Sequence, residues 1–361
     1  MINNQKISLS DMKRRYKSDL TFDTLEIVVK VDLLDNDNDY QIIDINVSDE
    51  PEYRHNGILN PVTDFVRDFV KTKVVSEGMH TKRKSWSVFY LLKELIDSLN
   101  GYLEENNSHE YELFFRGQND SWELKPSILR EGKGGYSDEF RDNFEQIYKE
   151  LAYEYPDSLT YLPPNVSDSD ERSANLAEMQ HYGLGTPLVD ITSNQFIAML
   201  FMISGFEQLE ERLHEPRFEI FFKRTDGDVQ LFQSVKKSAR SKRIDAQRGA
   251  FLNFERLSNS MLRGDFKIPR ISIVLTGDNE EYSVDRMTNE PDVQTEDTDV
   301  RKALAIKYVI NDFRKKLASF QYHESDLYPD FDKRLGYIKQ KYAGSNFSAG
   351  INVSKSGEGF E

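Results

Sequence analysis

The stretch ELFFRGQNDSWELKPSILR, residues 112–130, raises a question about one arginine. The apolar run at residues 113–115 is typical of a buried strand, and it ends directly on Arg116 and Gly117. Arg116 carries five N–H donors in a planar fork, which suits a phosphate or a carboxylate. Gly117 lets the backbone turn sharply and lets a ligand come close. Arg116 therefore either binds a ligand or pairs with a buried carboxylate, for which the sequence offers Asp190.

Composition limits the classes of protein that fit this chain. The chain has 361 residues, of which 38% are hydrophobic and 30% charged, a profile typical of a globular protein with a real core. It has no cysteine, which excludes disulfides, thiolate zinc sites and cysteine nucleophiles and favours a reducing, cytoplasmic location. No apolar run is long enough to cross a membrane. The net charge of −15 argues against broad coating of nucleic acid.

The first part of the chain, residues 1–80, has the pattern of a separate unit. Two strands are expected at residues 24–34 and 40–48, and a short helix at 60–75. No residue in this part suggests chemistry. We therefore expect a small N-terminal α+β module that docks a protein partner or a second copy of the chain.

The rest of the chain mixes helical and strand patterns, which predicts an α+β fold with a mixed central sheet and flanking helices. Strands are expected at residues 111–115, 187–191, 218–223, 249–254 and 268–275. Helices are expected at residues 85–101, 137–156, 175–183, 192–205, 301–320 and 331–342. Ser85 is the expected cap of the first helix and Gly101 its end. The acidic residues 277–299 predict a solvated loop, and 344–361 a flexible tail.

A second stretch, MQHYGLGTPLVDITSNQFIAMLF at residues 179–201, carries polar groups where a strand ends and a buried helix begins. Hydroxyls and backbone N–H groups at such a place bind anions, and Thr192 and Ser193 supply them. Ser193 is the expected cap of the helix, and it lacks the surroundings of a serine nucleophile. His181 either contacts a ligand or caps its own helix.

A third stretch, KKSARSKRIDAQRGAFLNFE at residues 236–255, is basic in an otherwise acidic protein. The loop from Lys236 to Arg243 is either a contact for a phosphate-bearing partner, including nucleic acid, or a solvated face. Gln247 precedes the following strand and Glu255 follows it. No phosphate-loop, zinc-protease or dinucleotide-binding motif occurs, and the scattered histidines predict no metal site.

Taken together, these stretches resemble the FRG domain family, named for the residues at 115–117. The resemblance rests on ordered blocks: the SW pair at 85–86, FFRGQ with WxLxPSILR, QHYGLGTPLVDIT, AQRGAFL and a final block at 324–338. It covers about residues 85–343. The family usually has a basic residue after the threonine of the GT pair, where this chain has Pro187. The family occurs in bacterial and mobile-element proteins, which implies a role in defence against phage.

A more distant resemblance is to the ADP-ribosyltransferase arrangement, and it implies NAD as a substrate. It places Arg116 on phosphate or ribose, Thr192 in the wall of the pocket, and Gln247 at the entrance of a late strand. The glutamate of that arrangement has no match at Ala250, and Glu255 lies five residues further on.

The two resemblances leave two hypotheses. In the first, the chain is an NAD-using transferase or glycohydrolase with Arg116, His181, Gln247 and Glu255 as catalytic groups. In the second, the same pocket binds a nucleotide or a nucleic-acid end without chemistry. Ligand contacts expected in both are Arg116, Gly117, Gln118, Tyr182, Asp190, Thr192, Ser193 and Gln247.

Overall fold

The fold is taken from a computed structural model. It describes residues 7–34, 39–48, 57–75, 87–106, 110–132, 135–164, 169–205, 214–225, 231–234, 249–277, 294–327, 335 and 338.

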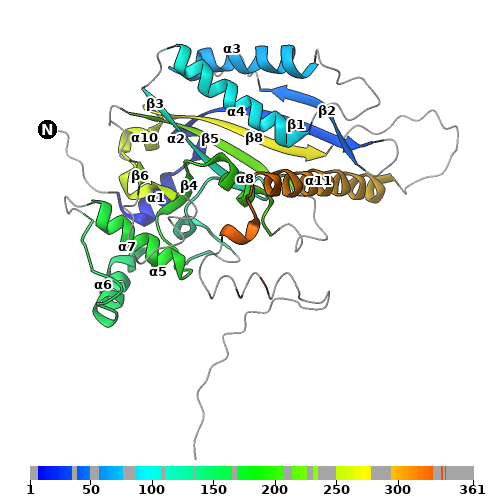
Figure 1. Cartoon of the computed structure of the whole chain (residues 1–361). Helices are drawn as coiled ribbons and strands as arrows, with labels where there is room; N and C mark the ends of the chain where they lie inside the picture. The colour runs from blue at the N-terminus through cyan, green and yellow to red at the C-terminus, as the bar shows by residue number, and fades with distance from the viewer. Residues whose placement is uncertain are drawn as a thin grey trace, which may run out of the picture.

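One eight-stranded sheet runs through the molecule (Figure 1). Its strands in chain order are β1 (Phe22–Leu33), β2 (Tyr40–Val47), β3 (Tyr111–Gln118), β4 (Leu188–Thr192), β5 (Arg217–Arg224), β6 (Phe232–Ser234), β7 (Gly249–Asn253) and β8 (Ile268–Gly277). Their order in the sheet is β2-β1-β8-β5-β3-β4-β7-β6. The pair β1–β8 is parallel and the other pairs are antiparallel. The predicted mixed sheet is thus confirmed.

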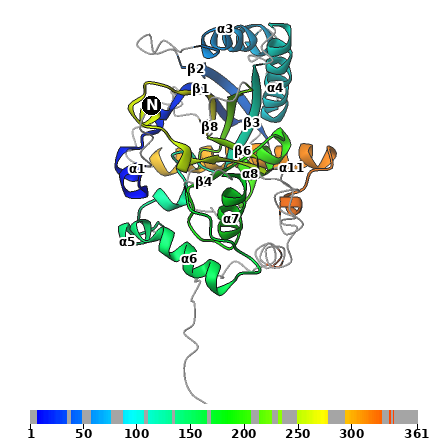
Figure 2. The ribbon, with the colours of Figure 1, turned by 90° about the vertical axis from the view of Figure 1, so that its left-hand side faces the viewer.

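Helices cover both faces of the sheet (Figures 1 and 2). Buried apolar residues form two clusters: the first core includes Leu25, Ile96 and Phe222, and the second core includes Phe22, Phe221 and Leu252. The helices whose apolar residues join the first core are α3 (Leu59–Phe69), α4 (Val88–Glu105), α8 (Gln195–Ile203) and α11 (Gln294–Ser319). Those that contribute to the second core are α1 (Leu9–Arg15), α6 (Phe144–Glu154), α7 (Ser169–His181) and α10 (Asn259–Arg263). The remaining short elements are α2 (Ser18–Thr21), η1 (Val70–Val75), η2 (Ser127–Leu129), α5 (Asp138–Asp142), η4 (Phe254–Arg256) and η5 (Glu324–Leu327).

Alternation along the central strands divides their side chains between the two cores. In β8, Ile271, Ile273 and Leu275 belong to the first core, while Arg270 and Ser272 occupy alternate positions of the strand and are also buried. Because successive side chains of a strand point to opposite faces, these polar residues lie on the face of the second core. That face carries the candidate site.

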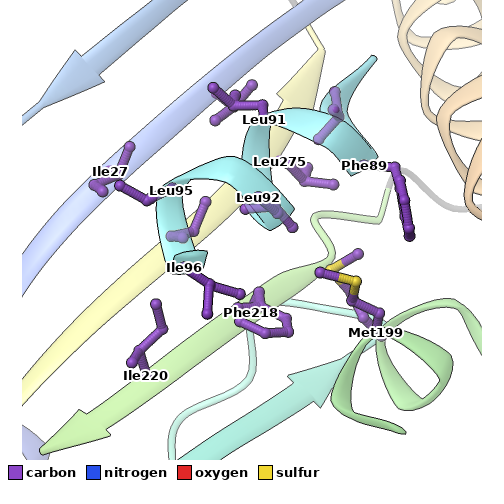
Figure 3. Close-up of a cluster of buried hydrophobic side chains, with 14 of the residues drawn as sticks. Ile27, Phe89, Leu91, Leu92, Leu95, Ile96, Met199, Phe218, Ile220 and Leu275 are labelled. Carbon is purple, nitrogen blue, oxygen red and sulfur yellow. The ribbon is translucent and has the colours of Figure 1, made fainter. Parts of the chain in front are cut away.

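Residues 1–80 contribute to the same sheet and the same core as the rest of the chain. β1 lies between β2 and β8, with Ile27 opposite Ile273. Figure 3 shows Ile27 in one apolar cluster with Leu95 of α4, Ile220 of β5 and Leu275 of β8. The predicted boundary near residue 80 therefore does not separate two sheets or two cores.

Several local expectations need correction. Gly101 does not end α4, which continues to Glu105 and has Ser87 at its N-cap position. The single helix expected at 137–156 is two helices, α5 and α6, that meet at Asn143. α11 begins at Gln294, so the last residues of the expected acidic loop are helical. Ser85, most of the predicted helix at 331–342 and the predicted tail lie outside the described residues.

Within the described part of the chain, no helix combines the length and the apolar character that crossing a membrane requires.

Candidate functional site

Arg116 lies inside a strand and not at its end. β3 continues to Gln118, and Arg116 is paired in register with Glu219 of β5. Its neighbours Phe114 and Phe115 belong to different cores, Phe114 to the second and Phe115 to the first. Alternation therefore places the Arg116 side chain on the face of the second core.

Next to Arg116, the sheet opens between β3 and β4. The two strands pair only at Phe115 and Thr192, whereas β3 and β5 pair along their whole length. The guanidinium of Arg116 bridges the gap, because its Nη1 donates a hydrogen bond of 2.7 Å to the backbone carbonyl of Asp190. The guanidinium of Arg116 thus donates to a carbonyl of β4, as a backbone N–H of the neighbouring strand does where two strands are paired.

A cavity of about 250 Å³ lies at this opening. Its wall combines apolar and polar side chains from β3, α7, β4, α8 and β7. The lining residues are Phe115, Arg116, Gly117, Ala177, Gln180, His181, Asp190, Ile191, Thr192, Phe201, Gly249, Ala250 and Phe251. The structure therefore brings together Arg116, Gly117, His181, Asp190 and Thr192, five of the residues predicted to form the site.

Arg116 is held in place by neighbouring acceptors. Its Nε donates to Gln118 Oε1 at 2.9 Å, and its Nη1 to the Asp190 carbonyl. A carboxylate oxygen of Glu219 lies 3.8 Å from Nε. Among the described residues none accepts a hydrogen bond from Nη2, and the side chain keeps 16% of its surface exposed. A fixed guanidinium with an unused edge in a cavity is suited to bind an anion.

The sequence analysis offered the carboxylate of Asp190 as the partner of Arg116 in the alternative to ligand binding, and the structure does not show that pair. Only the Asp190 backbone carbonyl contacts the guanidinium, and the carboxylate near it belongs to Glu219. Glu219 is completely buried, and its main partner is Arg270 of β8, whose Nη1 donates to it at 2.8 Å. Arg270 in turn donates to Thr24 of β1 at 2.9 and 3.1 Å. Arg116 thus ends a buried polar ladder that crosses four strands.

Gly117 is required by helix packing. A Cβ built at this position would lie 1.9 Å from the carbonyl oxygen of Ala198 and 2.6 Å from the backbone nitrogen of Met202. Both atoms belong to α8, which packs directly on β3. The expected sharp turn at Gly117 does not occur, because the strand continues through it to Gln118. Gly117 allows the backbone of α8 to pack directly against β3, and it also lines the cavity.

On the α7 side of the cavity, Gln180 and Asp190 form a fixed pair. Gln180 Nε2 donates to both carboxylate oxygens of Asp190, at 2.9 and 3.0 Å. Thr186 Oγ1 donates to Gln180 Oε1 at 2.5 Å, which fixes the orientation of the amide. Gln180 was missed by the sequence analysis, although it stands directly before His181 in a stretch already singled out. Which face of α7 meets the strand ends cannot be read from so short a pattern.

His181 and Tyr182 differ in their relation to the cavity. His181 is the last residue of α7, is half-buried and lines the cavity. Tyr182 contacts the His181 ring edge-on, with ring centroids 5.2 Å apart, but it is 76% exposed and does not line the cavity.

The start of α8 is capped by Asn194 and not by Ser193. The Asn194 side chain accepts a hydrogen bond from the backbone N–H of Phe196 at 2.9 Å. Ser193 is exposed and is not part of the cavity wall. Thr192 is buried, and its Oγ1 accepts from the backbone N–H of Asn194 at 3.1 Å. The polar end of β4 therefore stabilises the turn into α8 while Thr192 contributes to the cavity.

Gln118 and Glu255 serve the architecture around the cavity. Gln118 is buried and joins Arg116 to the backbone carbonyl of Trp122, which is 3.0 Å from its Nε2. Glu255, in η4, accepts two hydrogen bonds from Arg172 at 2.8 and 2.7 Å. Neither residue lines the cavity. Gln247 and the loop from Lys236 to Arg243 lie outside the described residues.

A second arginine, Arg130, lies near the same cavity. Partial burial lowers the pKa of its guanidinium, the nearby positive charge of Arg116 lowers it further, and Asp190 opposes both effects. Its Nε donates to the backbone carbonyl of Lys125 at 3.2 Å. The neighbourhood of Arg116 therefore carries two positive charges, those of Arg116 and Arg130, and one exposed carboxylate, that of Asp190. Separately, in the described residues no group of three or more histidines and carboxylates is placed to hold a metal ion.

Comparison with known proteins identifies the central part of the chain. Residues 111–211 match the family model of the FRG domain, so the chain contains an FRG domain. The matched segment begins with β3 and includes α7, β4 and α8, and with them Arg116, His181, Asp190 and Thr192. The cavity residues of β7 lie outside it. No curated protein and no solved structure is similar enough to this chain to count as a match.

Proposed function

We propose that the cavity between β3 and β4 binds NAD or a related nucleotide, with Arg116 as the clamp for its phosphate. The observation that carries the proposal is the state of Arg116. Three neighbouring groups fix its guanidinium, and one edge remains without a described partner in a cavity that also contains His181 and Thr192. Because the Arg116 guanidinium is already fixed before binding, its side chain loses little conformational freedom when it binds a phosphate.

The cavity size fits part of such a ligand. Pockets that enclose a whole drug-sized molecule usually measure about 300–1,000 Å³. At about 250 Å³, this cavity encloses one portion of a dinucleotide and leaves the remainder at the surface. Its apolar wall, with Phe115, Phe201 and Phe251, suits a planar ring, and its polar wall suits a phosphate or a sugar.

Two functions are compatible with such binding: NAD cleavage or ADP-ribosyl transfer, and recognition without chemistry. The position of Glu255 favours recognition. A carboxylate that stabilises an oxocarbenium-like transition state must face the reacting sugar, whereas Glu255 is held by Arg172 away from the cavity. Asp190 is the one carboxylate among the described lining residues, and chemistry in this cavity would depend on it.

The first experiment is calorimetric titration of the full chain with NAD. We expect binding by the wild type and loss of binding by Arg116→Ala. Arg263→Ala is the matched control, because Arg263 forms an exposed pair with Asp265 and lies outside the cavity. Unchanged NAD affinity in Arg116→Ala, with the control also unchanged, would remove the basis of the proposal.

A second experiment separates the two functions. The protein is incubated with NAD, and free nicotinamide is measured by mass spectrometry. Release above background, lost in Asp190→Asn, selects the enzyme. Binding without release selects the recognition module.

We further propose a role in defence against phage, a contact with nucleic acid and a protein partner, and each of these has its own test. Defence against phage is tested by infecting cells that carry the chain or its Arg116→Ala variant. A contact between the loop from Lys236 to Arg243 and nucleic acid is tested by neutralising two of its basic residues and measuring the salt dependence of binding. A protein partner for residues 1–80 is tested by affinity capture from the same cells.

A further inference from the structure

The carboxylate of Asp190 is a fixed hydrogen-bond acceptor in the cavity wall. Asp190 lies in the middle of β4 and is exposed, although the residues on either side of it are buried. A series of hydrogen bonds, from Thr186 to Gln180 and from Gln180 to the two carboxylate oxygens, fixes the orientation of the Asp190 side chain. Its own backbone carbonyl is held by Arg116, so the carboxylate and the guanidinium are placed relative to each other by one hydrogen bond.

Among the described residues, the hydrogen bonds to this carboxylate use only part of its capacity. Two carboxylate oxygens offer about four acceptor positions, and Gln180 uses one on each oxygen. The remaining positions have no donor among the described residues and can accept hydrogen bonds from a ligand. An ionised carboxylate has no proton to give, so a ligand group that meets Asp190 must itself be a donor.

The surrounding charges decide which donor fits. Arg116 lies beside Asp190, and Arg130 lies near both residues. These two cations repel an ammonium group on a ligand but not an uncharged hydroxyl. The ligand should therefore carry an anionic group for Arg116 and neutral hydroxyls for Asp190.

We infer that Asp190 is the specificity-determining residue of this site and accepts hydrogen bonds from the vicinal hydroxyls of a ribose whose phosphate is bound by Arg116. The inference rests on the proposed nucleotide function and narrows it to ribonucleotides. A carboxylate with two oxygens side by side matches two adjacent hydroxyls, whereas a deoxy sugar leaves acceptors unpaired. Gln180 acts as a positioning residue, because it holds the carboxylate without using its free positions.

The test compares AMP with 2′,3′-dideoxy-AMP in calorimetric titrations of the full chain. We expect the wild type to bind AMP about tenfold more tightly, the effect of losing hydrogen bonds to a charged group at a partly exposed site. In Asp190→Asn the preference should fall to about twofold or less. Asp265→Asn, an exposed aspartate outside the cavity, is the control and should keep the preference.

The outcomes separate this inference from the proposed function. Equal affinity of the wild type for the two nucleotides would overturn the role of Asp190 and leave phosphate binding by Arg116 intact. A preference that persists in Asp190→Asn would also overturn it. If the wild type binds neither nucleotide nor NAD, the proposed function fails and the inference with it. The comparison of the two probes on the wild type needs no variant to fold.

Discussion

Replacing Gly117 with alanine tests whether helix packing or ligand access explains this glycine. The new Cβ would lie 1.9 Å from the Ala198 carbonyl oxygen, whereas Cβ atoms in proteins essentially never approach closer than 3.0 Å. The clash is with backbone atoms, so no rotation of a side chain relieves it. Either α8 or β3 must move by about 1.1 Å. Because φ at Gly117 is not in the left-handed region, the steric clash is the only cost of the substitution.

The magnitude follows from what α8 carries. Overpacking a core costs about 1–3 kcal/mol when side chains can adjust. Here the helix must move together with its buried side chains, which are Ile197, Ala198, Met199, Leu200, Met202 and Ile203. We therefore expect Gly117→Ala to lower the free energy of unfolding by about 3 kcal/mol or more. Phe201 would move with the helix and change the cavity.

The assay is urea unfolding followed by circular dichroism, with Gly101→Ala as a control of the same chemistry. Gly101 lies within α4, and a Cβ there would meet no atom within 4 Å. Replacing a helical glycine by alanine at such a place stabilises by about 0.5–1 kcal/mol. The two variants should therefore shift the midpoint in opposite directions. If Gly117→Ala is as stable as the wild type but loses its ligand, the packing argument is refuted and ligand access explains the glycine.

Three further predictions concern Arg116, Glu255 and Asp138. Arg116→Lys should lower NAD affinity about tenfold and change the melting temperature little, because lysine keeps the positive charge near Glu219 but lacks the planar guanidinium. Calorimetry measures the affinity and thermal melts measure the stability, with Arg263→Lys as the control. A large fall in melting temperature with unchanged affinity would show that Arg116 serves the fold alone. Glu255→Gln should lower stability by about 1.5–3 kcal/mol, because it removes one charge partner of the buried Arg172, which keeps Glu145 as the other. It should leave NAD affinity unchanged in the same titration. Weaker NAD binding in a folded Glu255→Gln would restore Glu255 to the site. Hydrogen bonds from Lys13 and Arg141 hold the pKa of Asp138 at about 2, below its usual 3.8. A lowered pKa stabilises the fold above pH about 4, and this contribution is lost as the pH falls from about 4 to about 2. Asp138→Asn should therefore show a smaller loss of stability across that range in an acid titration followed by fluorescence, and an unchanged acid profile would contradict the assignment.

Local patterns in the sequence were sufficient for most elements of the fold. The apolar runs of β1, β5 and β8 and the helical spacing of α4 and α11 are strong signals, and each of these elements overlaps the range expected for it. The blocks that resemble the FRG family were likewise visible, and the match at residues 111–211 confirms the two blocks that lie within it, FFRGQ with WxLxPSILR and QHYGLGTPLVDIT. These features depend on residues close in sequence, which is why a pattern reveals them.

Element ends were less predictable because neighbouring elements decide them. Arg116 looked like the end of a strand because charged residues are rare inside core strands. It lies inside β3 because Glu219 and Arg270, both more than 100 residues further on, form a buried ladder that accepts its charge. Gly101 looked like the end of a helix, and α4 continues through it to Leu103, which is buried in the first core.

Local sequence patterns were enough to predict the class of fold, the FRG resemblance and the candidates Arg116, His181, Asp190 and Thr192. How these residues are used depends on contacts between distant elements. The divergence of β3 from β4 creates the cavity, the packing of α8 explains Gly117, and the position of α7 brings Gln180 to Asp190. The tertiary structure also placed Glu255 with Arg172, outside the cavity. The physical reason is that each of these contacts joins residues from different elements. Their register and crossing are set by the whole packed core, and no local pattern contains that information.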